Sequence, residues 1–350
     1  MTVRSSALSN APENALMGAA AIPAAADTVE SLPSDPESIT LPRSDSPRWP
    51  DFFIVGAQNS ATTSLFAYLQ KHPRIFMPAM KEPHYFSQLT PIGEMRYPST
   101  HVSNTRGYLK LFAKAPADRL SGEASSSYLW DTETPSRLHA ANRDAKIIII
   151  LRDPIARAYS QYLKDFREGW QELPFHETLR RDFATEPKGY GLTRLYVELG
   201  LYHQQVRRYL ETFGPEQVKI ILFKRLTSGA GLNRAVLEDV AEFLRIDPAQ
   251  LPPAVNAQIE NGFAVPRWNW ARKAAGSRVV RCLGRVLFPP RLGSTYTIKR
   301  FIYEPFLTRR ATPPQIDPEA KEWLKSIFEP DLTALEGLLH QRLPELRASW

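Results

Sequence analysis

The chain has 350 residues, 43% of them hydrophobic, and a formal net charge of +7 at pH 7. That length suits one large domain or two modest ones of about 100–200 residues each, and no apolar run reaches the roughly 18 residues of a transmembrane helix. Its single cysteine, Cys282, excludes an internal disulfide and a cysteine-based zinc site, so we expect a soluble protein of the cytoplasm.

The first 48 residues differ in composition from the rest. They are rich in Ala, Ser and Pro and hold almost no aromatic residue. Such a stretch buries too little apolar area to offset its ordering entropy, which predicts a disordered tail over residues 1–48. The alternative is a secretory signal, because Arg4 precedes the run ALMGAAAIPAAA. Glu13 ahead of that run and Pro23 within it argue against a signal.

Short apolar runs alternate with amphipathic stretches from Asp51 onward, which predicts βαβ units around a parallel sheet. We expect strands at residues 52–56, 119–125, 146–151 and 218–223. We expect helices at residues 62–72, 154–170, 200–214, 235–246 and 321–343, where apolar residues recur with a 3.6-residue period. The predicted fold is a single α/β domain over residues 49–350, with helices on both faces of a central parallel sheet.

The loop after the first expected strand has the composition of a phosphate-binding turn. Residues 52–65 read FFIVGAQNSATTSL. A strand that ends at Gly56 and turns into a helix near Ala61 or Thr62 directs free backbone amides at one point, with the positive end of the helix dipole behind them. Thr62 and Thr63 add hydroxyl donors. The alternative is an ordinary strand–turn–helix with threonine caps.

A standard P-loop NTPase is a poor fit to this loop. Its motif, G-x-x-x-x-G-K-[ST], requires a lysine that is missing here. We therefore expect a phosphate ligand that needs no metal.

A second anion site is expected after the strand at residues 146–151. Arg152 follows this strand directly, at the sheet edge where ligands bind, and Ser160 lies about two turns into the next helix. Pro154 at the start of that helix leaves its N-terminus open to an anion. The alternative is a capping Asp153 with Arg152 in a surface ion pair.

The chain resembles the sulfotransferases that use 3′-phosphoadenosine 5′-phosphosulfate (PAPS), and the branch of heparan sulfate sulfotransferases and their bacterial relatives above all. The likeness rests on four stretches in the same order: GAQNSATTSL, HPRIFMPAMKEPHYFS, GEASSSYL and LRDPIARAYSQYL. It covers roughly residues 50–350 and implies a P-loop-like, nucleotide-binding fold.

The resemblance also implies roles for particular residues. Arg152 and Ser160 would hold the 3′-phosphate of PAPS, with Arg267 as a further candidate. Glu82 matches the position of the catalytic base that takes the acceptor's proton, and His84 assists or orients it. The loop would hold the 5′-phosphosulfate end through Gln58, Asn59, Ser60, Ala61, Thr62, Thr63 and Ser64. The structural alternative for Glu82 is a loop cap paired with the preceding lysine.

The loop departs from the family pattern in two places. Asn59 stands where lysine is usual, and Ala61 stands where glycine is usual. That lysine would neutralise charge on the leaving phosphate, a contribution of about 3–4 kcal/mol for a preorganised donor. Three outcomes remain open: a slow enzyme, an enzyme in which Lys81 or Lys146 replaces the missing cation, and a PAPS-binding protein without turnover. We favour the first two, because the other motifs are intact.

The positive charge is concentrated in residues 267–310. This segment carries a net +10 and leaves −3 for the remainder of the chain. Because aromatic and aliphatic residues interleave with the charges, it suits an anionic glycan or the surface of an anionic membrane. The alternative is a solvated helix face packed on the core. We expect no nucleic acid partner, because no recognition motif accompanies the charge.

Residues 167–183 are expected to form a mobile region beside the acceptor cleft. Trp170, Phe175 and His176 could stack on a sugar ring there, but we favour core contacts for them. The sequence thus predicts transfer of a sulfo group from PAPS to a hydroxyl or amine, and we expect a carbohydrate acceptor. A lipid or a small natural product is the alternative acceptor.

Overall fold

The computed structural model describes residues 48–87, 101–167, 170–190, 193–229, 231–253, 264–266, 308–310 and 315–350. All of them belong to one unit of the chain, Ser46–Trp350. Residues 1–47 of the expected tail lie outside the described residues, as do Arg267 and almost all of the basic segment. Within the described part of the chain, no helix is both long enough and apolar enough to cross a membrane.

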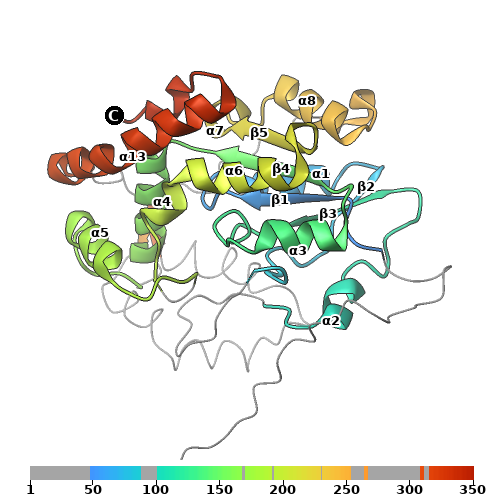
Figure 1. Ribbon diagram of the computed structural model, residues 1–350, viewed down its shortest axis with the longest axis horizontal. Helices are drawn as coiled ribbons and strands as arrows, with labels where there is room; N and C mark the ends of the chain where they lie inside the picture. Colours follow the sequence, from blue (N-terminus) through green and yellow to red (C-terminus); the bar gives the residue numbers. More distant parts are fainter. Residues whose placement is uncertain are drawn as a thin grey trace, which may run out of the picture. The chain divides into compact units, whose positions relative to one another are not determined.

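Five parallel strands form the central sheet, in the order β2-β3-β1-β4-β5 (Figure 1). This confirms the predicted α/β fold and all four predicted strands. The fifth strand, β2, is a two-residue edge strand that the sequence did not indicate. The bounds are β1 Phe52–Gly56, β2 Ile75–Phe76, β3 Leu120–Ala124, β4 Lys146–Leu151 and β5 Val218–Leu222.

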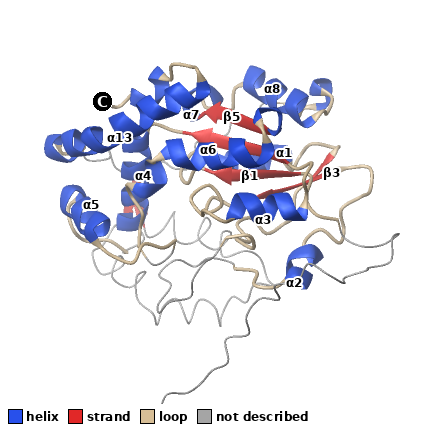
Figure 2. Ribbon diagram, in the orientation of Figure 1, coloured by secondary structure: helices blue, strands red, loops and turns tan. Residues whose placement is uncertain are grey.

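Helices cover both faces of this sheet (Figure 2). Side chains alternate between the faces along a strand. Ile148 of β4 therefore packs with Leu65 of α1 on one face, whereas Ile147 packs with Tyr209 of α6 on the other. Near-continuous apolar strands such as β4 are typical of a sheet buried on both sides.

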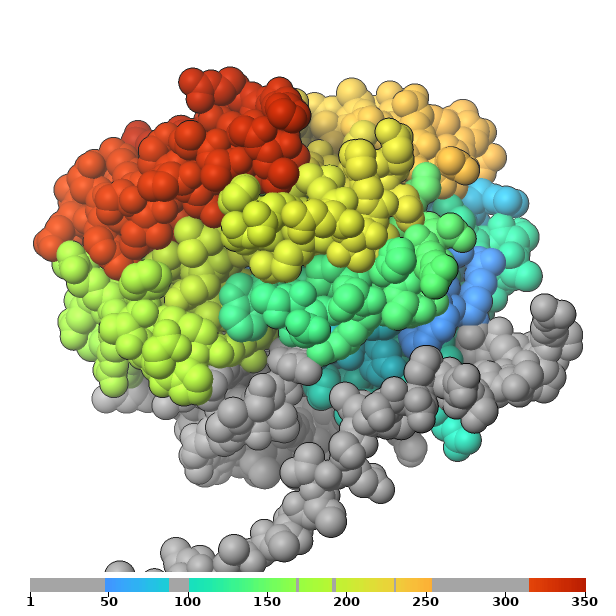
Figure 3. All heavy atoms as spheres, in the orientation of Figure 1, coloured from blue at the N-terminus to red at the C-terminus, as the bar shows by residue number. Residues whose placement is uncertain are grey.

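The helices that cover the first face are α1 Thr62–Leu69 and α8 Arg234–Leu244. Those that cover the second face are α2 Thr105–Lys110, α3 Thr134–Ala141, α6 Tyr202–Phe213 and α13 Pro318–Leu339. On the surface, α6 lies between α3 and α13 (Figure 3). The remaining elements are α4 Pro154–Arg167, α5 Phe175–Ala184, α7 Phe223–Leu226, β6 Ala264–Pro266, β7 Thr308–Arg310 and the short 3₁₀ helices Glu198–Gly200, Pro215–Gln217, Pro248–Gln250 and Pro344–Arg347.

The five predicted helices are present, but four others, α2, α3, α5 and α7, were not predicted. α5 occupies the second half of the stretch expected to be a mobile region. Phe175, at its start, is buried in a cluster with side chains of α4 and α13, so its expected core contacts are confirmed. This half of the stretch is therefore a helix packed on the core.

Candidate functional site

The loop after β1, the segment after β3 and the turn after β4 meet at the carboxyl edge of the sheet. The amide of Ala57 donates to the carbonyl of Ile150 at 2.8 Å, and the amide of Ser125 donates to the carbonyl of Ile54 at 3.2 Å. Gly56 permits this close approach, because a Cβ atom there would lie 2.7 Å from the Cβ of Leu129. In open α/β sheets this edge is where ligands bind.

The loop between β1 and α1 presents unpaired amide groups. α1 begins at Thr62 as expected, and its N-cap residue, Ala61, makes no side-chain cap. The backbone amides of residues 58–64 have no hydrogen-bond acceptor within the described part of the chain. The side-chain Nδ2 of Asn59 is also buried without such a partner. A set of donors at a helix N-terminus suits the oxygens of a phosphate, and the loop therefore fits the phosphosulfate end of the expected donor.

The side chains of this loop differ in exposure. Ser60 and Thr62 are buried, whereas Thr63 is exposed and the other four predicted donor-site residues, Gln58, Asn59, Ala61 and Ser64, are partly exposed. Both departures from the family pattern have left-handed backbones, with φ of 61° at Asn59 and 62° at Ala61. Alanine is strained there and asparagine is better tolerated.

Arg152 connects the two predicted anion sites. Its Nη1 donates to the carbonyl oxygen of Asn59 at 2.7 Å, and its guanidinium lies 4.5 Å from the ring centroid of Phe223. Burial lowers the pKa of Arg152, but an arginine with this ordinary value stays charged. No carboxylate within the described residues forms an ion pair with it, so the surface ion pair considered above is wrong. The capping role of Asp153 is confirmed, because its Oδ1 accepts from the amide of Ala156 at 3.0 Å.

Ser160 lies two turns into α4 and is partly exposed. The described contacts do not join it to Arg152, and Arg267 lies outside the described residues. The assignment of these two residues to the 3′-phosphate stays a prediction.

Glu82 is held in a dense set of polar contacts. Its Oε2 accepts from the amide of Ser126 at 2.7 Å and from the hydroxyl of that residue at 3.1 Å. Lys81 Nζ forms an ion pair with Oε1, and His84 Nε2 lies 3.4 Å from Oε2. The side chain remains 26% exposed. The lysine pairing considered above is therefore present, and the carboxylate side chain keeps some access to solvent.

The pKa of Glu82 determines how well this carboxylate can act as a base. Burial alone would raise the pKa of Glu82, but Lys81, His84 and the Ser126 amide outweigh it and bring that pKa down to about 2. A carboxylate with so low a pKa is ionised at neutral pH and is a weak proton acceptor. Burial lowers the pKa of His84, although the negative charge of Glu82 opposes this effect.

The structure brings in groups that the sequence did not single out. His84 Nδ1 lies 2.6 Å from the hydroxyl of Ser127, and its ring lies 5.6 Å from that of Tyr190. Tyr202 of α6 donates from its hydroxyl to the carbonyl oxygen of Arg152 at 2.8 Å. The serines belong to GEASSSYL, which had marked the family without assigning roles. The tyrosines come from distant parts of the chain and carry no local signal.

Lys146 is wrong as a replacement for the missing loop lysine. It begins β4 and pairs in register with Phe52 at the start of β1, which places it at the opposite edge of the sheet. Its Nζ donates to the carbonyl oxygen of Phe243. Lys81, which pairs with Glu82, is the candidate that remains at the carboxyl edge.

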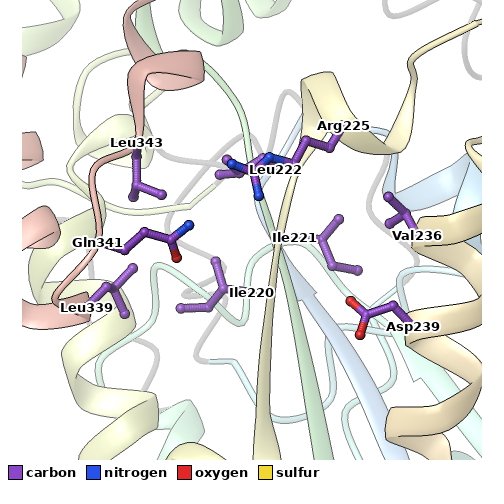
Figure 4. A pocket seen from close by; sticks show the side chains of 9 residues that line it. All are labelled: Ile220, Ile221, Leu222, Arg225, Val236, Asp239, Leu339, Gln341 and Leu343. Carbon is purple, nitrogen blue, oxygen red and sulfur yellow. The ribbon is translucent and has the colours of Figure 1, made fainter.

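Two of the cavities in the described part of the chain are lined by none of the residues predicted to bind the donor or to act as the base. One, of about 200 Å³, lies along β5 and is lined by Ile220, Ile221, Leu222, Arg225, Val236, Asp239, Leu339, Gln341 and Leu343 (Figure 4). The other, of about 700 Å³, includes Lys146 and Arg245 and therefore lies at the opposite edge of the sheet. No group of three or more metal-ligating side chains occurs in the described part of the chain.

Comparisons with known proteins agree on one family. Residues 49–261 match the family model described as "Sulfotransferase domain". The crystal structure of a sulfotransferase from Alicyclobacillus acidocaldarius is similar with a TM-score of 0.62 and 30% identity, covering 85% of this chain and 99% of that one.

Two curated relatives are carbohydrate-modifying enzymes by name. Carbohydrate sulfotransferase 15 of Mus musculus is 28% identical over 325 residues, covering 78% of this chain and 54% of that protein. Heparan sulfate glucosamine 3-O-sulfotransferase 3B1 of Homo sapiens is 24% identical over 302 residues, covering 85% and 66% respectively. The chain thus spans between about half and two thirds of the length of these relatives.

Proposed function

This chain belongs to the sulfotransferase family, and from that premise we propose that it transfers a sulfo group from PAPS to a hydroxyl or amine of a carbohydrate. The observation that carries the proposal is the contact between Arg152 Nη1 and the carbonyl of Asn59 at 2.7 Å. A partly buried cation therefore lies beside a loop of unpaired amides, as the two ends of one doubly phosphorylated nucleotide require. The names of the curated relatives support a carbohydrate acceptor.

Bound PAPS would supply the sulfo group and a stable leaving phosphate. The amides of residues 58–64, with the side-chain amide of Asn59, hold the phosphosulfate end. Arg152 binds the 3′-phosphate. In the transfer, the acceptor oxygen or nitrogen forms a bond to sulfur as the sulfur–oxygen bond to the phosphate breaks, and the acceptor's proton passes to Glu82.

Lys81 has two roles in this proposal. It is a cation at the same sheet edge as the loop, and it also lowers the pKa of Glu82. When Lys81 turns toward the anionic donor, Glu82 loses its closest positive charge and its pKa rises. The ion pair therefore links donor binding to the basicity of Glu82.

A PAPS-binding protein without turnover is the second candidate, because Asn59 carries no charge. Calorimetric titration with the nucleotide product 3′-phosphoadenosine 5′-phosphate, together with transfer of radiolabelled sulfate from PAPS to heparan oligosaccharides, separates the two. Glu82→Ala should keep nucleotide affinity and lose transfer, whereas Arg152→Ala should lose nucleotide affinity. Equal binding by the wild type and the Arg152 variant would overturn the proposal, and tight binding without transfer to any sugar would favour the second candidate.

A further inference from the structure

A buried carboxylate lies beneath the loop that carries Glu82. Glu123 of β3 is fully buried, and three hydroxyl groups donate to it. Ser125 Oγ donates to its Oε1 at 2.7 Å, and the hydroxyls of Tyr128 and Tyr108 donate to its Oε2 at 2.8 and 3.0 Å. A buried carboxylate needs such partners, and two of them also contact the loop that carries Glu82.

Two of these three hydroxyls also hold the Glu82 loop. Ser125 Oγ accepts from the amide of His84 at 3.1 Å, and the hydroxyl of Tyr128 accepts from the amide of Phe86 at 3.3 Å. A hydroxyl has one proton. Because both residues direct that proton at Glu123, their lone pairs face the loop amides.

Tyr108 differs from this pair. Its hydroxyl donates to Glu123, but it accepts no amide from the loop within the described contacts. A third anchor of the loop, the bond from the amide of Glu82 to the carbonyl of Ala124 at 2.9 Å, does not involve Glu123. The loop is thus held at alternate amides, two of them through hydroxyls that Glu123 orients.

We propose that Glu123 is a positioning residue whose ionised form fixes the hydroxyls of Ser125 and Tyr128 as acceptors and so holds Glu82 and His84 in the geometry for transfer. This inference rests on the proposed function. Protonated Glu123 is itself a donor, so one hydroxyl must turn its proton away from the carboxyl. Where that hydroxyl is Ser125 or Tyr128, the turned proton competes with the loop amide for the same side of the oxygen, and the loop loosens.

The electrostatics place this change near neutral pH. The pKa of Glu123 is raised to about 7, chiefly by burial. The negative charge of Glu82 raises this pKa further, whereas the hydrogen bonds from the three hydroxyls lower it. The titratable groups that interact with Glu123 are Tyr108 of α2, Tyr128 after β3, Tyr209 of α6 and Glu82 of the loop. Because its pKa is raised, Glu123 is ionised above about pH 7 and protonated below it. Glu82, with a pKa of about 2, stays ionised throughout, and the lowered pKa of His84 moves its titration to more acid pH.

The test compares Tyr128→Phe with Tyr108→Phe, which is a matched control. Each variant removes one hydroxyl from Glu123 Oε2, but only the first removes an acceptor for a loop amide. Transfer of radiolabelled sulfate from PAPS to heparan oligosaccharides is measured from about pH 5 to about pH 9. Tyr128→Phe should lower kcat at the alkaline plateau by about tenfold with an unchanged KM for PAPS. Tyr108→Phe should keep the plateau and move the acid limb to higher pH, because a bond that lowers the pKa of Glu123 is lost.

Glu123→Gln is the third variant. It cannot ionise, so kcat should be low and the limb near pH 7 should vanish. An acid limb retained in Glu123→Gln, or equal plateaus in the two tyrosine variants, would overturn the inference and leave the proposed function standing.

Hydrogen exchange tests the role of Glu123 without requiring sulfate transfer. Hydrogen exchange of the His84 and Phe86 amides in the wild type, corrected for its intrinsic pH dependence, should speed up as pH falls through about 7, whereas the Glu82 amide should change less. If the wild type transfers no sulfate, the proposed function is wrong, but the hydrogen-exchange experiment still tests the role of Glu123. Exchange of all three amides that is independent of pH would overturn the inference.

Discussion

Asn59 stands where the family carries a lysine, and its backbone is left-handed. Asn59→Lys should place a charge beside the leaving phosphate and raise kcat by up to about a hundredfold, or ~3 kcal/mol. It should also lower the free energy of unfolding by about 1 kcal/mol, because lysine tolerates a positive φ less well. Transfer kinetics and thermal denaturation measure the two effects.

Asn59→Gln is the control for this variant. It imposes a similar backbone cost and keeps an amide, but adds no charge. Stability should therefore fall without a gain in kcat. If the lysine and glutamine variants turn over at the same rate, charge at this position is not what limits the reaction.

The low pKa of Glu82 makes a prediction about stability. Because that pKa falls from 4.5 to about 2 on folding, the ionised group stabilises the protein above about pH 4.5 and this contribution is lost as pH falls toward 2. Glu82→Gln should lower the free energy of unfolding at pH 7 by up to about 3 kcal/mol. The difference from the wild type should shrink below pH 4 in urea denaturation series, and a difference independent of pH would contradict the assigned pairing.

At the scale of elements, the start of α4 is tied to the end of the chain. Asp153 caps α4 and also accepts from the amide and the hydroxyl of Ser349, at 2.7 and 2.8 Å. Asp153→Ala removes the cap and strands the Ser349 amide, so it should destabilise the protein by about 2 kcal/mol or more. It should also weaken nucleotide binding, because Arg152 is the preceding residue.

Ser349→Ala is the matched control for the cap. It removes one hydroxyl bond and leaves the cap and the Ser349 amide in place, so the expected loss is about 1 kcal/mol, with nucleotide affinity unchanged. Chemical denaturation and calorimetric titration measure both. Equal losses in the two variants would show that the cap itself contributes little.

Local pattern was enough to predict the long strands and the longest helices, and it missed several of the shorter elements. β4 and β5 read as apolar runs, and α6 as a long periodic stretch, so burial of a whole face was visible in the sequence. α2 has only 6 residues, too few for a helical period to show, although the cap at Asn104 marks its start. β2 is a strand only because β3 lies beside it.

The candidate site follows the same rule. The proximity of Arg152 to the loop could be predicted, because neighbouring parallel strands bring their carboxyl ends together. The contacts of Glu82 with Ser126 and of the His84 amide with Ser125 could not, since they depend on how the Glu82 loop packs on the segment after β3. The prediction that Lys146 replaces the loop lysine was wrong because it considered only the charge of the residue. Lys146 begins β4, so the direction of the strand places it at the opposite edge of the sheet.

For the whole molecule, charge is distributed unevenly. The segment 267–310 carries a net +10, whereas the remainder of the chain carries −3. An anionic glycan acceptor would be attracted to such a segment at long range, and salt would screen that attraction. A membrane surface and a packed helix face remain the alternatives to a glycan.

Charge reversal within this segment separates the glycan from the packed face. Arg278→Glu with Arg281→Glu should weaken binding to immobilised heparin by about tenfold at moderate salt and should leave nucleotide affinity unchanged. The control makes the same change in charge at the exposed Arg106 and Arg143, where little loss is expected. A glycan that reads only net charge would respond equally to both double variants. If the segment packs on the core instead, the Arg278→Glu, Arg281→Glu variant should have a lower melting temperature and no selective loss of heparin binding. If vesicles of anionic lipid bind the wild type more tightly than heparin does, a membrane surface is favoured over a glycan.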